Sequence, residues 1–138
     1  MGPGAGFTTT HGYVPNLPAI LPQQQESCLS IYNAYLYAEN AFNIPVVAYS
    51  GEIDKQKQAA DIMQKHIQSF GIPMEHLIAP GLEHKFPPEW QQKAFAAYAP
   101  HIAKGRAAYP EKIKFVTYTL KYPKCDWVEI LGLKKHYL

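Results

Sequence analysis

The chain has 138 residues, of which 47% are hydrophobic and 17% are charged, with a formal net charge of +2. This length suits one domain with a modest core, and the near balance of charge excludes the strongly basic footprint typical of nucleic-acid-binding domains. No apolar run is long enough to span a bilayer, and the N-terminus lacks the charged and apolar regions of a signal peptide. We therefore expect neither a nucleic-acid partner nor a membrane partner.

The first part of the chain has little regular pattern. Residues 1–26 are rich in glycine and proline, and we expect them to form an irregular loop segment. The glycines of residues 2–6 lack the preceding strand and the following Lys-Ser/Thr of a phosphate-binding loop. From Ser27 or Ser30 to Phe42, apolar residues recur on one side, which predicts a helix with serine as its N-cap.

The most informative stretch starts at residue 44. The short apolar run at 44–49 predicts a buried strand of a parallel sheet, and Asp54 follows it on a turn. Residues 56–70 then show helical periodicity, which Gly71 and Pro73 end. A second short strand is expected at 74–80, and His84 lies on the turn after it.

A strand, a crossover helix and a second strand form a βαβ unit, in which both strands point the same way. Asp54 and His84 are therefore expected at the same carboxyl edge of the sheet, where ligands bind in open α/β proteins. Their separation of 84 − 54 = 30 residues fits one helix and one strand with short loops.

The C-terminal third contains one more helix and a β region. Pro88 suits a first helical turn, and the period predicts a helix to about Lys104, ended by Gly105, with a buried stripe. The predicted stripe comprises Trp90, Ala94, Ala97, Tyr98 and Ile102. Residues 112–122 alternate like a strand, 123–126 resemble a turn, and 127–131 resemble a returning strand, which predicts an antiparallel hairpin.

Two cysteines, Cys28 and Cys125, lie far apart without the spacing of a metal site, and they are too few for a disulfide framework. We expect two unrelated thiols, and neither a metal nor another cofactor.

An acid and an imidazole on adjacent turns suit acyl transfer, in which aspartate orients the histidine that deprotonates a serine. Each residue also has a simpler explanation: Asp54 could cap the following helix, and His84 could be a solvent-facing turn residue. Both explanations would have to hold together by coincidence. Glu52 and Glu83 are the rival carboxylates.

The segment VAYSGEIDKQKQAAD (residues 47–61) resembles the acid-bearing segment of bacterial prolyl-oligopeptidase-like α/β-hydrolases, a family of serine esterases and peptidases. APGLEHKF (residues 79–86) is similar to that family's histidine turn. The resemblance extends to GPGAGF (2–7), which looks like the loop before the acid strand, and to 115–122, 127–128 and 132–133, which look like the start of a C-terminal β region. It implies that Asp54 is the triad acid, that His84 is the general base, and that the parent protein is secreted or periplasmic.

The chain departs from the family in one respect. It contains no Gly-x-Ser-x-Gly nucleophile elbow. Ser50 ends a strand, but one strand end does not readily supply both nucleophile and acid at triad geometry, so we expect a structural role for Ser50.

We therefore expect a partial α/β-hydrolase fold, comprising the last parallel strands with flanking helices, followed by a short antiparallel hairpin. The expected parts are a loop segment (1–26), the C-terminal part of the hydrolase domain (27–106) and the start of a β region (107–138). The chain would be the Asp/His portion of a serine hydrolase acting on small ester or peptide substrates, inactive alone. We expect it to be poorly stable or to self-associate through an uncovered sheet edge. The alternatives are a non-catalytic binding module and one half of a split hydrolase.

Overall fold

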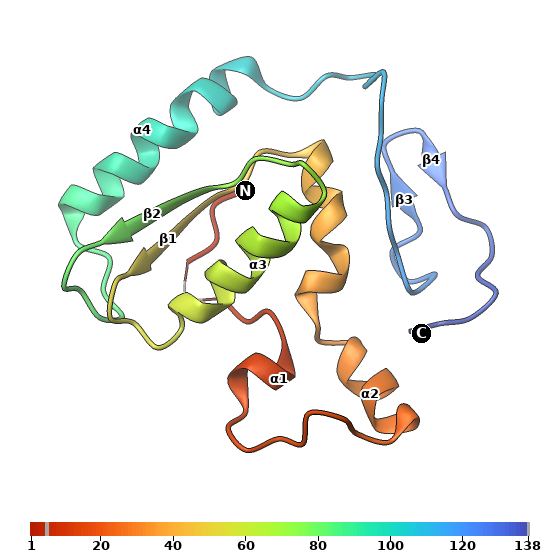
Figure 1. Cartoon of the computed structure of the whole chain (residues 1–138). Helices are drawn as coiled ribbons and strands as arrows, with labels where there is room; N and C mark the ends of the chain where they lie inside the picture. Colours follow the sequence, from red (N-terminus) through yellow and green to blue (C-terminus); the bar gives the residue numbers. More distant parts are fainter. Residues whose placement is uncertain (5, 138) are drawn as a thin grey trace.

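The computed structural model describes residues 1–4 and 6–137 (Figure 1). The elements, in chain order, are α1 (Thr10–Tyr13), α2 (Gln23–Ser30), the 3₁₀ helix η1 (Ala34–Asn43), β1 (Val47–Gly51), α3 (Lys57–Ser69), β2 (Glu75–Ala79), α4 (Pro88–Lys104), β3 (Lys124–Cys125) and β4 (Val128–Glu129). Strands β1 and β2 form a small parallel sheet, and β3 and β4 form an antiparallel pair. The chain is therefore an α/β protein. None of the described helices is both long and apolar enough to cross a membrane.

The predicted βαβ unit is confirmed. Strands β1 and β2 pair in parallel from Val47 opposite Glu75 to Gly51 opposite Ala79, and α3 connects them. Strand β1 begins three residues later than the start predicted at 44. Proline at position 45 cannot donate to a ladder, which explains the late start.

Helices cover both faces of this sheet. Ala48 belongs to a core cluster with Ile67 of α3, whereas the ring of Tyr49 lies 6.0 Å from that of Trp90 in α4. Because successive strand residues point to opposite faces, α3 and α4 lie on opposite sides of β1. The stripe predicted on α4 is only partly buried, since Ala94 is buried but Ile102 is 75% exposed. The two-stranded sheet is too small to cover the C-terminal end of so long a helix.

The N-terminal segment is more ordered than predicted. Residues 1–4 run parallel to β1, because the amides of Val47 and Tyr49 donate to the carbonyls of Met1 (3.0 Å) and Pro3 (3.1 Å). This extended segment satisfies amides of β1 that would otherwise be unpaired. Helix α1 and the first residues of α2 also lie within 1–26. The prediction of a wholly irregular segment is therefore wrong.

The helix predicted from residue 27 or 30 to 42 is divided in two. Helix α2 ends at Ser30, and the chain becomes helical again, as the 3₁₀ helix η1, from Ala34. Between them Asn33 is buried, and its side-chain oxygen accepts a hydrogen bond from the amide of Thr10 (3.1 Å). This long-range bond ties Asn33 to α1 at the point where the two helices are separated.

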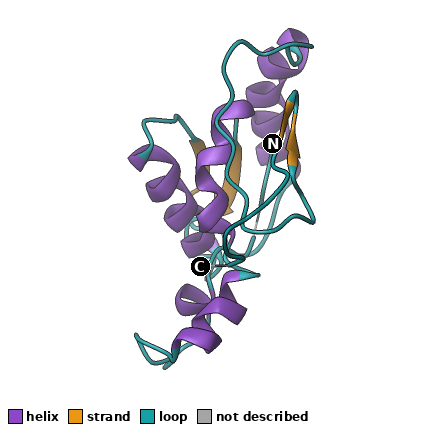
Figure 2. Ribbon diagram, turned by 90° about the vertical axis from the view of Figure 1, so that its right-hand side faces the viewer, coloured by secondary structure: helices purple, strands orange, loops and turns teal. Residues whose placement is uncertain are grey.

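The C-terminal hairpin is shorter than predicted and displaced. No strand forms over 112–122, and β3 occupies part of the predicted turn at 123–126. Instead, Asn40 and Asn43 of η1 each bond both backbone groups of one residue in this segment, Val116 and Lys114 respectively. Residues three apart lie on the same side of a 3₁₀ helix. The Asn40 and Asn43 side chains therefore bond the same segment, and they take the place of a partner strand. The hairpin itself lies apart from the parallel sheet (Figure 2).

Replacing Asn40 with alanine should release the 112–119 segment from η1. The side chain donates to the Val116 carbonyl (2.9 Å) and accepts from its amide (2.7 Å), so both groups lose a partner. We expect the free energy of unfolding to fall by about 1–3 kcal/mol, with faster hydrogen exchange at the Val116 amide. Gln68→Ala, on an exposed position of α3, is the control. Unchanged exchange at Val116 would contradict this role of Asn40.

Candidate active site

Asp54 lies on the turn between β1 and α3. Its amide donates to the carbonyl of Gly51 (3.2 Å), and its carboxylate Oδ1 accepts from the amide of Gln56 (2.8 Å). This bond to the amide two residues further on is an Asx turn, so Oδ1 helps to begin α3. This role is similar to the helix cap that the sequence offered as the simpler explanation for Asp54. The side chain is only 7% exposed. The second oxygen, Oδ2, points to His84.

His84 lies on the loop that follows β2. Its Nδ1 atom is 3.0 Å from Asp54 Oδ2, and its side chain is 63% exposed. Because an ionised carboxylate only accepts hydrogen bonds, the proton of a neutral His84 belongs on Nδ1, which leaves Nε2 as an acceptor facing outward. The structure thus joins the two residues that the sequence predicted to lie together.

The loops carrying these residues are tied together by backbone hydrogen bonds. The amides of Glu52 and Ile53 donate to the carbonyls of Ala79 (2.9 Å) and Leu82 (3.1 Å). The carboxylate of Glu52 accepts from the amide of Gly81 (2.8 Å). Glu52, a rival to Asp54 in the sequence, is therefore bound to the backbone of the histidine loop.

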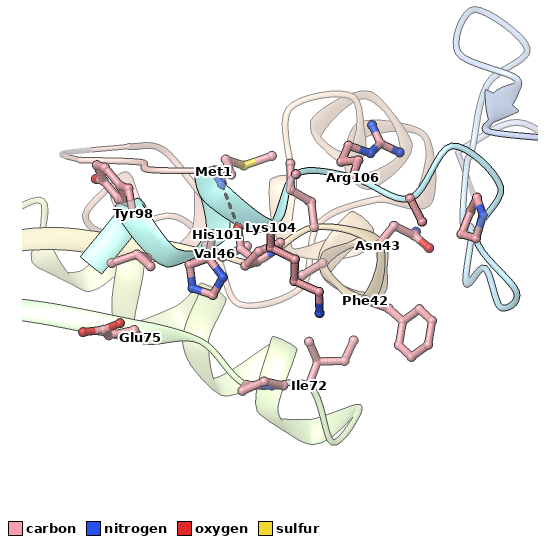
Figure 3. A pocket seen from close by; sticks show the side chains of 18 of the residues that line it. Met1, Phe42, Asn43, Val46, Ile72, Glu75, Tyr98, His101, Lys104 and Arg106 are labelled. Carbon is pink, nitrogen blue, oxygen red and sulfur yellow. Dashed lines mark hydrogen bonds between the residues drawn. The ribbon is translucent and has the colours of Figure 1, made fainter. Parts of the chain in front are cut away.

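A small cavity of about 200 Å³ lies beside the pair, and Gly4, Tyr49, Ser50, Asp54, His84, Lys85 and Phe86 line it. A larger open cleft of about 970 Å³ lies at the opposite, amino edge of the sheet, and its lining includes Met1, Val46, Glu75 and, from α4, Tyr98 and His101 (Figure 3). Only the small cavity contains the acid and the imidazole. We therefore place the candidate site there, and not in the larger cleft.

Ser50 is committed to a different histidine. Its hydroxyl lies 2.9 Å from Nε2 of His76; the Ser50 residue and the His76 side chain are each 3% exposed. His76 Nδ1 is buried without a hydrogen bond, and the nearest carboxylate oxygen, Oδ1 of Asp61, is 3.5 Å away. This contact supports the structural role expected for Ser50, because it links β1, β2 and α3. Sequence reasoning missed His76, although the strand period places it on the Ser50 face.

His76 should make the fold sensitive to acid. Burial, the largest effect, lowers its pKa; Asp61 opposes this shift and Lys57 adds to it. In the unfolded chain histidine titrates near about 6.5. Below that pH the unfolded state binds more protons than the folded state, so stability falls as the pH drops toward the lower pKa of the folded state.

We expect the free energy of unfolding to decrease between pH 7.5 and 5.5 with a His76 contribution of at most about 1.4 kcal/mol per pH unit. Denaturant unfolding of wild type and His76→Gln checks this, and the variant should show a shallower pH dependence. His101→Gln on α4 is the control. Equal slopes for wild type and His76→Gln would contradict the assignment.

The described part of the chain contains two cysteines but no cluster of metal ligands. No group of three or more His, Cys, Asp or Glu side chains there could hold a metal ion. Cys28 is exposed and Cys125 is half-buried, and both are free thiols. Burial raises the pKa of the Cys125 thiol, and nearby Asp126 adds to the shift.

The chain matches no protein-family model, and comparison with curated proteins and with solved structures finds no similar protein. The α/β class and the geometry of the site are therefore the basis for any functional assignment.

Proposed function

We propose that Asp54 and His84 are the orienting acid and the general base of a serine hydrolase that acts on ester or peptide carbonyls. The observation that carries this proposal is the 3.0 Å contact between a nearly buried carboxylate and an exposed imidazole at the carboxyl edge of the parallel sheet. The resemblance of residues 47–61 and 79–86 to prolyl-oligopeptidase-like hydrolases supports it.

In this mechanism Asp54 holds the proton on Nδ1 of His84. The free Nε2 removes the proton of a serine hydroxyl as that oxygen attacks the substrate carbonyl, and later returns it to the leaving group. The Asp54 carboxylate stabilises the imidazolium that forms between these steps. The other carboxylate oxygen, Oδ1, accepts a hydrogen bond from the amide of Gln56, which fixes the carboxylate in place.

The nucleophile must come from outside the described residues in this proposal. Within residues 1–4 and 6–137, no hydroxyl or thiol forms a hydrogen bond with His84. Among the described residues, nothing pairs with the outer edge of residues 1–4, because Met1 and Pro3 bond β1 and the backbone groups of Gly2 and Gly4 point away from it. Gly4 also lines the cavity beside His84. A further parallel strand on this edge would deliver its C-terminal turn to His84.

The free edge also has a consequence for the chain by itself. An unpaired sheet edge is a template for pairing with another chain, so the 138-residue chain is expected to self-associate and to lack hydrolase activity.

The native reading frame tests the proposal. We expect the frame upstream of the Met1 codon to stay open and to encode a strand followed by Gly-x-Ser-x-Gly. A stop codon and a genuine start immediately before Met1 would overturn the single-chain hydrolase. A binding module or a split enzyme would then be the account to test.

A further inference from the structure

We propose that Tyr49 is a positioning residue, which holds the loop after His84 so that the imidazole faces Asp54. The catalytic meaning of this inference rests on the proposed function. The orientation of the His84 imidazole ring can be measured without any catalytic turnover.

The side chain of Tyr49 reaches this loop directly. Its hydroxyl donates a hydrogen bond to the carbonyl of Lys85 (2.6 Å), the residue next to His84. The ring packs against Phe86, with a distance of 4.3 Å between ring centroids, and Tyr49 is 7% exposed. A short bond from a nearly buried, packed ring is a rigid attachment, because few rotamers are open to the donor.

The need for such an attachment follows from the position of His84. Leu82 is held on one side of His84 by the amide of Ile53, and Tyr49 holds Lys85 on the other side. The next attachment, from the side chain of Gln91 to the carbonyl of Phe86, is exposed. The backbone of His84 itself bonds to nothing in the described residues. The amide of Lys85 also donates to the carbonyl of Glu83 (2.8 Å), which closes a tight turn around His84. The place of this turn relative to Asp54 depends on the attachments of Leu82 and Lys85 to Ile53 and Tyr49.

The phenol stays a donor over a wide pH range. Burial raises the pKa of Tyr49, and the nearby Asp54 carboxylate raises it further. The hydroxyl therefore remains protonated at neutral and mildly alkaline pH, and the bond to Lys85 persists there.

The experiment measures the tautomer of His84 by ¹⁵N–¹H correlation spectra of histidine-labelled protein, with the signal assigned by His84→Gln. We expect the Nδ1–H form in wild type and a mixture of both tautomers in Tyr49→Phe. Tyr98→Phe, which removes a hydroxyl on α4, should keep the wild-type spectrum. Replacing Tyr49 with p-aminophenylalanine, which retains a donor, should restore the Nδ1–H form.

A second readout covers the case in which Tyr49→Phe folds poorly as the 138-residue chain. In the complete polypeptide of the proposed hydrolase, whose further strands would support the fold, Tyr49→Phe should lower kcat by about 10- to 100-fold with little change in KM. A wild-type tautomer in folded Tyr49→Phe, or an unchanged kcat, overturns the role of Tyr49 and leaves the proposed function intact. Absence of the Nδ1–H form in the wild-type protein overturns both.

Discussion

In the complete polypeptide of the proposed hydrolase, replacing His84 with alanine should lower kcat for ester hydrolysis by about 10³- to 10⁶-fold. In the proposed mechanism the imidazole, which bonds Asp54 through Nδ1, uses Nε2 as the base, and alanine leaves no group to accept the serine proton. Asp54→Asn should cause a loss in the same range, because an amide no longer requires the proton on Nδ1. Steady-state kinetics with a p-nitrophenyl ester provide the measurement.

The matched control is His101→Ala. His101 lies on α4 beside the large cleft at the other edge of the sheet, so its removal should leave kcat within a factor of about two. An unchanged rate for His84→Ala, or an equal loss for His101→Ala, would exclude His84 as the general base.

Replacing Gly51 with alanine should have the largest effect on the structure. The ends of the acid and histidine loops meet at this residue, and a Cβ there would overlap the backbone carbonyl oxygens of Leu82 and Glu83. Backbone atoms cannot rotate away as a flexible side chain can, so the histidine loop must move. We expect the free energy of unfolding to fall by about 2–4 kcal/mol and the Nδ1–H form of His84 to be lost.

Gly132→Ala provides the comparison, because a Cβ at Gly132 meets no atom within 4 Å. Its stability should stay within about 0.5 kcal/mol of wild type. If Gly51→Ala were as stable as Gly132→Ala and kept the Asp54–His84 bond, the close approach of the two loops at Gly51 would not be needed to position Asp54 and His84.

The βαβ unit and the acid–imidazole pair could be predicted because both depend on local patterns. Helical periodicity over 57–69 lies between two short apolar strands. Because such a crossover makes the two strands parallel, Asp54 and His84 follow at the same edge of the sheet. A spacing of 30 residues leaves the connecting helix, strand and loops little freedom in length. In the structure the two side chains are 3.0 Å apart.

The features that sequence reasoning missed depend on contacts between distant segments. The pairing of residues 1–4 with β1 and the bonding of residues 114 and 116 to Asn40 and Asn43 leave no period in the sequence. Alternation over 112–122 predicted a strand, but residues 118–122 form bends and a turn, and asparagine side chains bond Lys114 and Val116 where a partner strand was expected. Tyr49 resembled an ordinary core aromatic, because its hydroxyl partner lies 36 residues away.

The most direct measurement of the central claim is to label the complete polypeptide with a fluorophosphonate and to locate the modified serine by mass spectrometry. We expect a label on one serine outside residues 1–138, with labelling greatly slowed in His84→Ala and unaffected in His101→Ala. A label on Ser50, whose hydroxyl is bonded to His76 in the structure, would contradict the account, as would undiminished labelling in His84→Ala.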